Sequence, residues 1–238
     1  MHKIKFSIII PALNEEENIE NAIKSLLGLN YNRENFEIIV VDNDSSDQTS
    51  EKAKSAGADK VVVELIRGTN FARERGRREA SGEIIAFLDS DSEVCPDWLI
   101  IIEKDLSIEG VAAVSGPYDY GFKGLQKSMS ELNDRMVSKF VPQLLYFVFR
   151  RKAGVLIGGN FAGYAYVFEE IGGLPPIKFW GDDAATAMLI SRKVGTVLFD
   201  MDLKIKSSAR RFKKDGYFQL FYHYITTYMK IYFSKDYK

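Results

Sequence analysis

Three short runs of apolar, β-branched residues in the first half of the chain alternate with stretches that have helical periodicity. The runs are Phe6 to Ile10, Phe36 to Val41 and Ile84 to Leu88. Strands of a parallel sheet have this composition because helices cover both faces of the sheet. Weaker runs at Lys60 to Leu65 and Val111 to Ser115 indicate two further strands. The sequence therefore predicts an α/β fold, with a mostly parallel sheet flanked by helices.

The segment between the first two predicted strands indicates a helix from Glu15 to Leu29. Apolar residues recur there at helical spacing, at Ile19, Ala22, Ile23, Leu26 and Leu27. Asn14 and Glu17 resemble a capping box, in which two side chains bond each other's backbone N–H groups at the start of a helix. We therefore expect this helix to begin directly after Asn14.

The second half of the chain is less regular. Residues 125 to 152 indicate one long helix, whose end puts an aromatic run beside the three cations Arg150 to Lys152. Residues 217 to 238 indicate a C-terminal amphipathic helix, crowded with Phe, Tyr, Ile and Met. Either segment could pack on the protein or lie in a membrane interface, where rings sit at headgroup depth and cations meet anionic lipids. The C-terminal segment could also precede a removed membrane span. We expect a peripheral membrane contact.

Composition excludes several classes of function. The chain has 238 residues, 32 of them basic and 33 acidic, and its net charge of −1 gives no general attraction to nucleic acid, so no such partner is expected. The single cysteine, Cys95, excludes an intramolecular disulfide, and two histidines leave no Cys/His zinc site. The apolar run before Pro11 is too short for a secretion signal, and no stretch has the length that spans a bilayer. We expect a cytoplasmic location, which includes the cytoplasmic face of a membrane.

Polar segments follow the predicted strands. The triplet Asp89-Ser90-Asp91 comes directly after the third apolar run, and strand alternation points both carboxylates to one side while Ser90 turns away. Two hard oxygen ligands suit Mg²⁺ or Mn²⁺, although Asp and Ser are also favoured in a plain polar turn. Parallel sheets bind ligands at the carboxyl ends of their strands. We therefore expect one edge to be lined by the loops Pro11 to Glu15, Asp42 to Thr49 and Asp89 to Glu93.

Taken in order, the motifs of the chain resemble those of the family 2 glycosyltransferases, which have the Rossmann-like GT-A fold. The resemblance runs from Ser7 to about Gly216. Its pieces are Ser7 to Glu16, Ile38 to Thr49, Gly68 with Ala72, Arg73 and Gly76, Ala80 to Glu83, Phe87 to Asp91, Gly158 to Phe161, Ile171 to Leu174 and Gly181 to Asp183. It implies one GT-A domain over residues 1–216, with a nucleotide-binding half at 1–115 and an acceptor half at 116–216, followed by the helix at 217–238.

The activity that the resemblance implies is an inverting, metal-dependent transfer of a hexose from a nucleotide-diphosphate sugar, linked to UDP or GDP. The acceptor to expect is a glycan or a polyprenyl phosphate. A bridging Mn²⁺ or Mg²⁺ stabilises the charge that develops on the departing diphosphate. By resemblance, Asp91 binds this metal and Asp89 binds the metal or the ribose. Glu93 is a third ligand or a solvated loop acid.

The resemblance also implies a donor-binding surface. Its expected members are Pro11, Leu13, Glu15, Asp42, Asn43, Arg73, Asp89, Ser90, Asp91, Arg210 and Arg211. Asn43 stands where a base-contacting Asp is usual, and its amide both donates and accepts, so the base stays open. Arg73 matches an arginine that approaches the nucleotide; the alternative is a helix-surface cation. Arg210 and Arg211, extended by Lys213 and Lys214, are expected to grip phosphate oxygens, with lipid attraction and surface salt bridges as alternatives.

The acceptor side is implied at Asp182 and Asp183. Asp183 is expected to be the base that deprotonates the acceptor hydroxyl, because a neighbouring like charge raises the pKa of a carboxyl group, and Asp182 to be its neighbour or an acceptor contact. An ionised phosphate acceptor would need no base, and an Asp here could also be a helix N-cap.

Two other classes compete with a glycosyltransferase. A sugar nucleotidyltransferase shares the sheet and the acidic metal site, but would carry a Gly-rich, Lys-bearing phosphate loop near the first strand, and Pro11 to Glu16 has neither residue. A non-catalytic nucleotide-sugar-binding protein could keep the fold without turnover.

Overall fold

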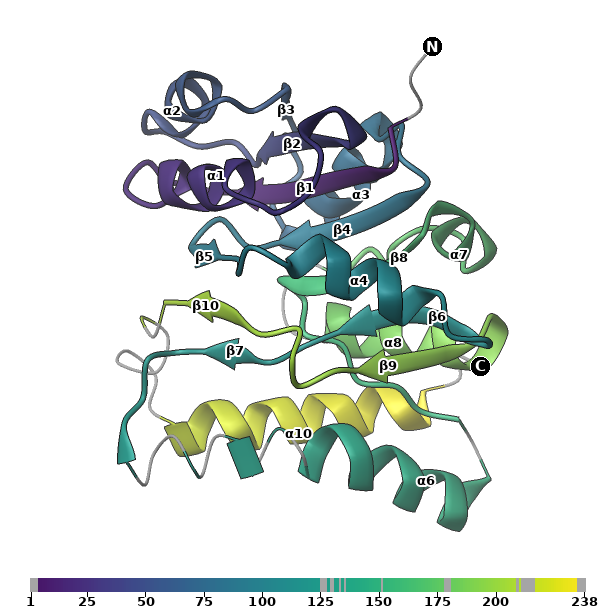
Figure 1. Cartoon of the computed structure of the whole chain (residues 1–238). Helices are drawn as coiled ribbons and strands as arrows, with labels where there is room; N and C mark the ends of the chain where they lie inside the picture. Colours follow the sequence, from purple (N-terminus) through teal and green to yellow (C-terminus); the bar gives the residue numbers. More distant parts are fainter. Residues whose placement is uncertain are drawn as a thin grey trace.

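The computed structural model describes residues 4–124, 128, 131–132, 134, 136–150, 152–177, 181–208, 210 and 217–234. Its centre is a seven-stranded sheet in the order β3-β2-β1-β4-β8-β6-β9, with helices on both faces (Figure 1). Its strands are β1 Phe6–Ala12, β2 Phe36–Asp42, β3 Lys60–Val63, β4 Ile84–Leu88, β6 Val111–Ser115, β8 Asn160–Tyr164 and β9 Thr196–Phe199. A three-stranded sheet contains β5 Ser92–Glu93, β10 Ile205–Ser207 and β7 Tyr118–Asp119, in that order.

The helices surround this sheet. They are α1 Ile19–Leu27, α2 Thr49–Ala56, α3 Thr69–Glu79, α4 Trp98–Leu106, α6 Val141–Phe149, α7 Ala165–Glu170, α8 Asp182–Lys193 and α10 Tyr217–Phe233, with a 3₁₀ turn at Arg33–Asn35 and a π-helix at Met136–Phe140. The α/β architecture expected from the sequence is confirmed. The five predicted strands are present, although β3 ends at Val63 and leaves Leu65 75% exposed.

Strand pairing brings the predicted loops to one edge. β1 lies between β2 and β4 and is parallel to both, and Ala12 at the end of β1 is opposite Asp42 at the end of β2. β8 is antiparallel to β4 and to β6, whereas β9 is parallel to β6. Strands from both halves of the chain therefore share one sheet. The division at residue 115 stays a prediction.

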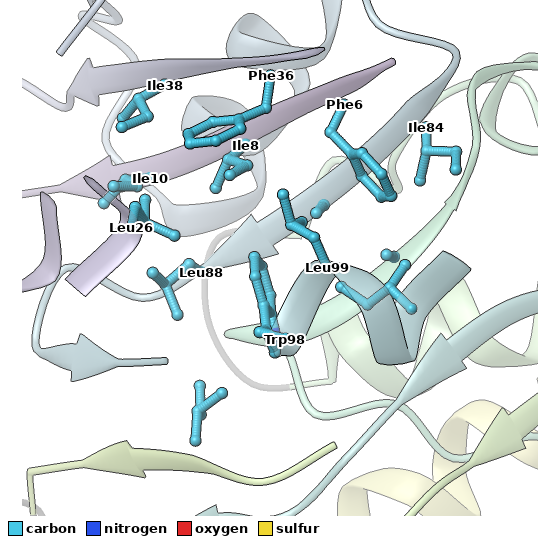
Figure 2. Close-up of a cluster of buried hydrophobic side chains, with 14 of the residues drawn as sticks. Phe6, Ile8, Ile10, Leu26, Phe36, Ile38, Ile84, Leu88, Trp98 and Leu99 are labelled. Carbon is cyan, nitrogen blue, oxygen red and sulfur yellow. The ribbon is translucent and has the colours of Figure 1, made fainter. Parts of the chain in front are cut away.

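The sheet is buried on both faces, as the apolar runs predicted. On one face Ile8 and Ile10 pack with Leu26 of α1 and Trp98 of α4, in the cluster of Figure 2. On the other face Ile9 packs in a cluster with residues of α3, α7 and α8. At about 25 cal/mol for each Å² of apolar surface, this double burial is the main term that stabilises the fold.

The start of α1 differs from the sequence-based expectation. The helix begins at Ile19, and its N-cap residue Asn18 makes no side-chain capping bond. Asn14 lies four residues before Asn18 and has a φ angle of 53°. Its Oδ1 accepts a 2.8 Å hydrogen bond from the Ser46 N–H. The predicted capping box is therefore wrong, because Asn14 instead ties the loop after β1 to the loop after β2.

The two aromatic segments of the second half have different environments. In α10, Tyr228, Ile231 and Tyr232 are buried in a cluster with residues of α6 and α8, so packing on the domain is confirmed for this face. In α6, Leu145 is the residue that joins that cluster as a buried side chain. The long helix predicted for residues 125–152 lies partly outside the described residues; its described end is the π-helix followed by α6. Among the described residues, no helix has the length and apolar character that a bilayer span requires.

A substitution at Gly116 tests how closely the end of β6 approaches the segment before β10. A Cβ atom at this position would overlap the backbone carbonyl of Leu203, which cannot move without displacing β10. We expect Gly116→Ala to lower the free energy of unfolding by about 2 kcal/mol, in the range for overpacked sites. Gly28→Ala is the control, because its Cβ would meet only ordinary contacts. Urea denaturation followed by circular dichroism measures both. Equal losses would contradict the close approach.

Candidate active site

Asp89 is held at the end of β4 by two side chains from other elements. Its Oδ1 accepts a 3.0 Å hydrogen bond from Arg73, and its Oδ2 accepts a 2.7 Å bond from the Tyr118 hydroxyl. Tyr118 in turn accepts a bond from the Gly159 N–H. A Cβ atom on Gly159 would overlap the Asp89 carboxylate, so this close packing requires glycine. The orientation of Asp89 is therefore fixed before any ligand arrives.

Arg73 on α3 connects the two predicted halves of the site. Its side chain is only 4% exposed, and it donates to Asp89 and, over 2.8 Å, to Asp182 Oδ2. Its Nε is buried without a hydrogen-bond partner among the described residues. The alternative of a helix-surface cation is wrong. Its predicted contact with the nucleotide stays a prediction, whereas its contact with both aspartates is part of the fold.

Asp182 and Asp183 are the first two residues of α8. The N-cap position belongs to Gly181, at φ 97°, so neither aspartate is the N-cap that the sequence left as an alternative. Asp183 Oδ1 accepts a 2.7 Å bond from the Ala184 N–H. Burial, and after it the charge of Asp182, raises the pKa of Asp183 to about 7. The hydrogen bond from the Ala184 N–H and the charge of Arg73 lower this pKa, but the desolvation of the carboxyl group outweighs them.

Tyr224 of α10 belongs to the same region, although sequence analysis did not identify it. Its pKa is raised well above the ordinary tyrosine value by burial, with further contributions from the charges of Asp183 and Asp134. Burial also raises the pKa of Asp134 to about 6. The side of the site that contains Asp183 is thus partly desolvated and acidic. Tyr118 was also missed; its one sequence signal is a polar aromatic residue just after a predicted strand.

Arg210, near the end of the chain, contacts the loop that follows β1. Its guanidinium donates over 2.8 and 3.0 Å to the two carboxylate oxygens of Glu15, and over 2.9 Å to Asp91 Oδ2. The Glu15 N–H donates to Thr49 at the start of α2, which fixes the loop. Three residues expected in one site therefore meet. Arg211, Lys213 and Lys214 lie outside the described residues.

Asp42 and Asn43 hold loops in this structure. The Asn43 amide donates to the carbonyl groups of Glu64 and Ile66 over 2.8 and 2.9 Å, and its Oδ1 accepts from the Gly68 N–H over 2.7 Å. Asp42 accepts bonds from the Ser45 N–H and the Ser50 hydroxyl. Both N–H donors of the Asn43 amide are thus committed to the β3–α3 connection. A contact with the base stays a prediction for both residues.

The remaining predicted residues divide by exposure. Pro11 and Ser90 are buried, whereas Leu13, two residues after Pro11, is 37% exposed. Glu93 is exposed on β5. Within the described part of the chain, no group of three or more His, Cys, Asp or Glu side chains is arranged to hold a metal ion. The three-carboxylate set that included Glu93 stays a prediction; the exposure of Glu93 on β5 is in keeping with the alternative of a solvated loop acid.

The sequence matches the family model described as glycosyl transferase family 2 over residues 7–172. Two curated relatives are similar over part of the chain. A dolichol-phosphate mannosyltransferase of Pyrococcus furiosus is 41% identical over 129 residues, which cover 50% of this chain and 35% of the relative. A GalNAc(5)-diNAcBac-PP-undecaprenol beta-1,3-glucosyltransferase of Campylobacter jejuni is 30% identical over 154 residues, which cover 57% and 48%. The match thus spans less than half the length of each of these relatives.

A solved structure supports the fold. The mannosyltransferase PcManGT of Pyrobaculum calidifontis, in complex with GDP-Man and Mn²⁺, superposes with a TM-score of 0.72 at 23% sequence identity. The superposition covers 96% of this chain and 64% of that one. At this identity the likeness shows the fold, which is GT-A.

Replacement of Arg73 tests the buried ion pairs. Arg73→Met keeps much of the side-chain volume but leaves Asp89 and Asp182 without their shared cation. We expect the free energy of unfolding to fall by about 3 kcal/mol, as for other broken buried pairs. Arg78→Met on the same helix is the matched control: its side chain is 68% exposed, and its loss is expected to cost less than about 1 kcal/mol. Chemical denaturation gives both values, and similar losses would show that burial adds nothing to the Arg73 pairs.

Proposed function

The chain belongs to glycosyl transferase family 2, and we propose that it is an inverting, metal-dependent enzyme that moves a hexose from a nucleotide-diphosphate sugar to an acceptor hydroxyl. One observation carries this proposal. The buried guanidinium of Arg73 joins Asp89, from the predicted donor and metal side, to Asp182, from the predicted acceptor side. A donor bound at Asp89 and an acceptor bound at Asp183 would therefore lie next to each other, on the two sides of Arg73.

The donor side fits a divalent cation with a diphosphate. Asp91 has a 20% exposed side chain whose Oδ2 accepts a hydrogen bond from the half-exposed Arg210. Hard carboxylate oxygens are ligands that Mn²⁺ and Mg²⁺ accept. Asp91, with Asp89, would hold the ion. The ion would supply positive charge at the departing diphosphate. Arg210 has the planar geometry that binds phosphate oxygens in pairs, and Arg211 is proposed to join it. The Mn²⁺ and GDP-Man in the superposed structure are in keeping with this assignment.

The acceptor side fits a hydroxyl group better than an ionised phosphate. An inverting transfer to a hydroxyl needs a base, and a carboxylate with a pKa near 7 both accepts a proton and is ionised in a substantial fraction at neutral pH. The described ionisable groups near Tyr224 include the acids Asp182, Asp183 and Asp134. These acids would repel a phosphate dianion. We therefore favour a glycan, free or lipid-linked, over a polyprenyl phosphate.

Membrane contact is a further part of the proposal. The names of the two curated relatives contain dolichol phosphate and undecaprenol, which are lipid carriers. We propose that this chain works at the cytoplasmic face of a membrane, on an acceptor presented there. The aromatic and basic end of the segment before Lys152 supports such a contact.

Asp91→Asn tests the metal assignment. With UDP- and GDP-sugars as a donor panel, we expect a donor and Mn²⁺ together to raise the melting temperature of the wild-type protein, and the variant to lose the part of the rise that depends on Mn²⁺. Asp97→Asn, an exposed acid that follows in the same connection and bonds Asn30, is the matched control and should respond like the wild type. An unchanged response of Asp91→Asn would refute the metal assignment. No response of the wild type to any donor would refute the proposed function.

The pH dependence of transfer tests Asp183 as the base. Because only ionised Asp183 accepts a proton, the rate should rise as pH increases through about 7 and level off above it. Asp183→Asn should lower kcat by at least about 100-fold and remove this dependence, with donor binding retained. Asp105→Asn is the control, since burial raises the pKa of Asp105 to about 6 beside Asp200, outside the site. Donor binding without product at any pH would instead indicate a non-catalytic binding protein.

A further inference from the structure

We propose that a groove between α6 and the edge strand β9 is a binding site for an anionic membrane lipid. The groove has a volume of about 320 Å³ and is lined by residues that include Pro142, Tyr146, Lys152, Ser191 and Thr196. This volume lies at the lower end of the range for ligand sites. Ser191 is eight residues after Asp183 on α8, which places the groove about 12 Å along that helix from the proposed base. The groove is therefore separate from the transfer site.

One buried hydroxyl that lines the groove has no hydrogen-bond partner among the described residues. Ser191 is 5% exposed, and its Oγ makes no hydrogen bond with any described residue. Gly154 lies so close that a Cβ atom there would overlap this oxygen, so glycine leaves the hydroxyl its space. An unpaired buried hydroxyl costs free energy that a ligand acceptor can recover. Because Ser191 lines the groove, the ester carbonyl of a lipid is the acceptor that we assign to its hydroxyl.

The charge at the rim selects an anionic headgroup. Lys152 lines the groove and is exposed, and Arg150 lies two residues before it. The sequence from Met136 to Lys152 contains four basic residues and no acidic one, in a chain whose net charge is −1. The positive charge of the exposed Arg150 and Lys152 attracts phosphate headgroups. It also opposes the symmetric pairing of two copies of this chain through the same face, because like charges would meet.

An exposed apolar stripe runs along α6 and the π-helix before it, next to the groove-lining residues in the sequence. Met136, Phe140, Leu144 and Phe147 are 49%, 61%, 62% and 72% exposed and follow one another at intervals of four, four and three residues. Leu145, on another side of α6, is buried against α10, where Tyr232 donates to its carbonyl oxygen. Apolar surface of this extent beside cations is typical of a helix that lies in a membrane interface. A lipid chain in the groove would be continuous with the bilayer that covers the stripe.

This inference refines the membrane contact proposed above and does not depend on glycosyl transfer. The full chain is mixed with phosphatidylglycerol or phosphatidylcholine in detergent, and bound lipid is counted by native mass spectrometry. We expect one phosphatidylglycerol per chain and little phosphatidylcholine. Flotation with vesicles of phosphatidylcholine, alone or mixed with phosphatidylglycerol, tests the same preference on a bilayer.

Three variants separate the features of the site. Thr196→Trp fills the groove from the exposed edge of β9 and should abolish the bound lipid. Lys152→Glu should weaken binding at least about tenfold, since it removes one cation and adds an anion. Ser191→Ala should weaken it about fivefold, the effect of one hydrogen bond. Lys54→Glu on α2, at the other end of the sheet in Figure 1, is the matched charge control and should bind like the wild type.

Several outcomes would overturn the lipid site. Equal binding of the two lipids, or wild-type binding by Thr196→Trp and Lys152→Glu, would exclude a specific anionic lipid in this groove. Flotation that survives in Thr196→Trp without a bound lipid would restrict the contact to the apolar stripe. If the wild-type protein forms dimers and Thr196→Trp disrupts them, the groove is instead part of an interface in which the edge strands β9 of two copies pair. Donor-induced thermal stabilisation, measured in parallel, separates each of these results from a failure of the proposed transferase function.

Discussion

The ion pairs of Arg73 are the interaction on which the rest of the site depends. A cation that is 4% exposed is stable in this position because two carboxylates approach it from different parts of the chain, one directly after β4 and one at the start of α8. Each carboxylate in turn is oriented by the arginine, so neither half of the site has this geometry alone. The glycines at 158 and 159 leave room for the guanidinium and for Asp89. Buried charges are costly without partners, which makes this arrangement sensitive to any change in one member.

Asp89 and Asp183 lie on opposite sides of this arginine in different environments. Asp89 accepts hydrogen bonds from Arg73 and from Tyr118, whereas Asp183 lies one residue beyond the paired Asp182 and is bonded to a backbone amide. Burial and the adjacent charge therefore raise the pKa of Asp183 to about 7. Different environments for similar side chains are a general way to assign a metal or donor role to one acid and a base role to another.

The two aromatic segments show why composition does not determine location. Both α6 and α10 are rich in Phe and Tyr, and their sequences are compatible with packing or with a membrane interface. In the structure, α10 buries Tyr228 and Tyr232, whereas Leu144 and Phe147 of α6 remain 62% and 72% exposed. The difference arises because α10 packs on α8, and one side of α6 then packs on α10. The outer side of α6 has no described element above it, and a lipid surface is our proposal for what covers it.

The sequence by itself determined the sheet, since runs such as Phe6 to Ile10 are apolar enough to be buried on both faces only between layers of helices. It also identified most polar residues at the sheet edge, because carboxyl ends of parallel strands converge there. Only the tertiary structure decided that Asn14 bonds Ser46 in place of capping α1, that Glu93 faces solvent, and that Arg73 is buried between two aspartates. These outcomes depend on contacts between residues 16 to 109 positions apart along the chain, or on the pairing of β5 with β10, which local patterns do not encode.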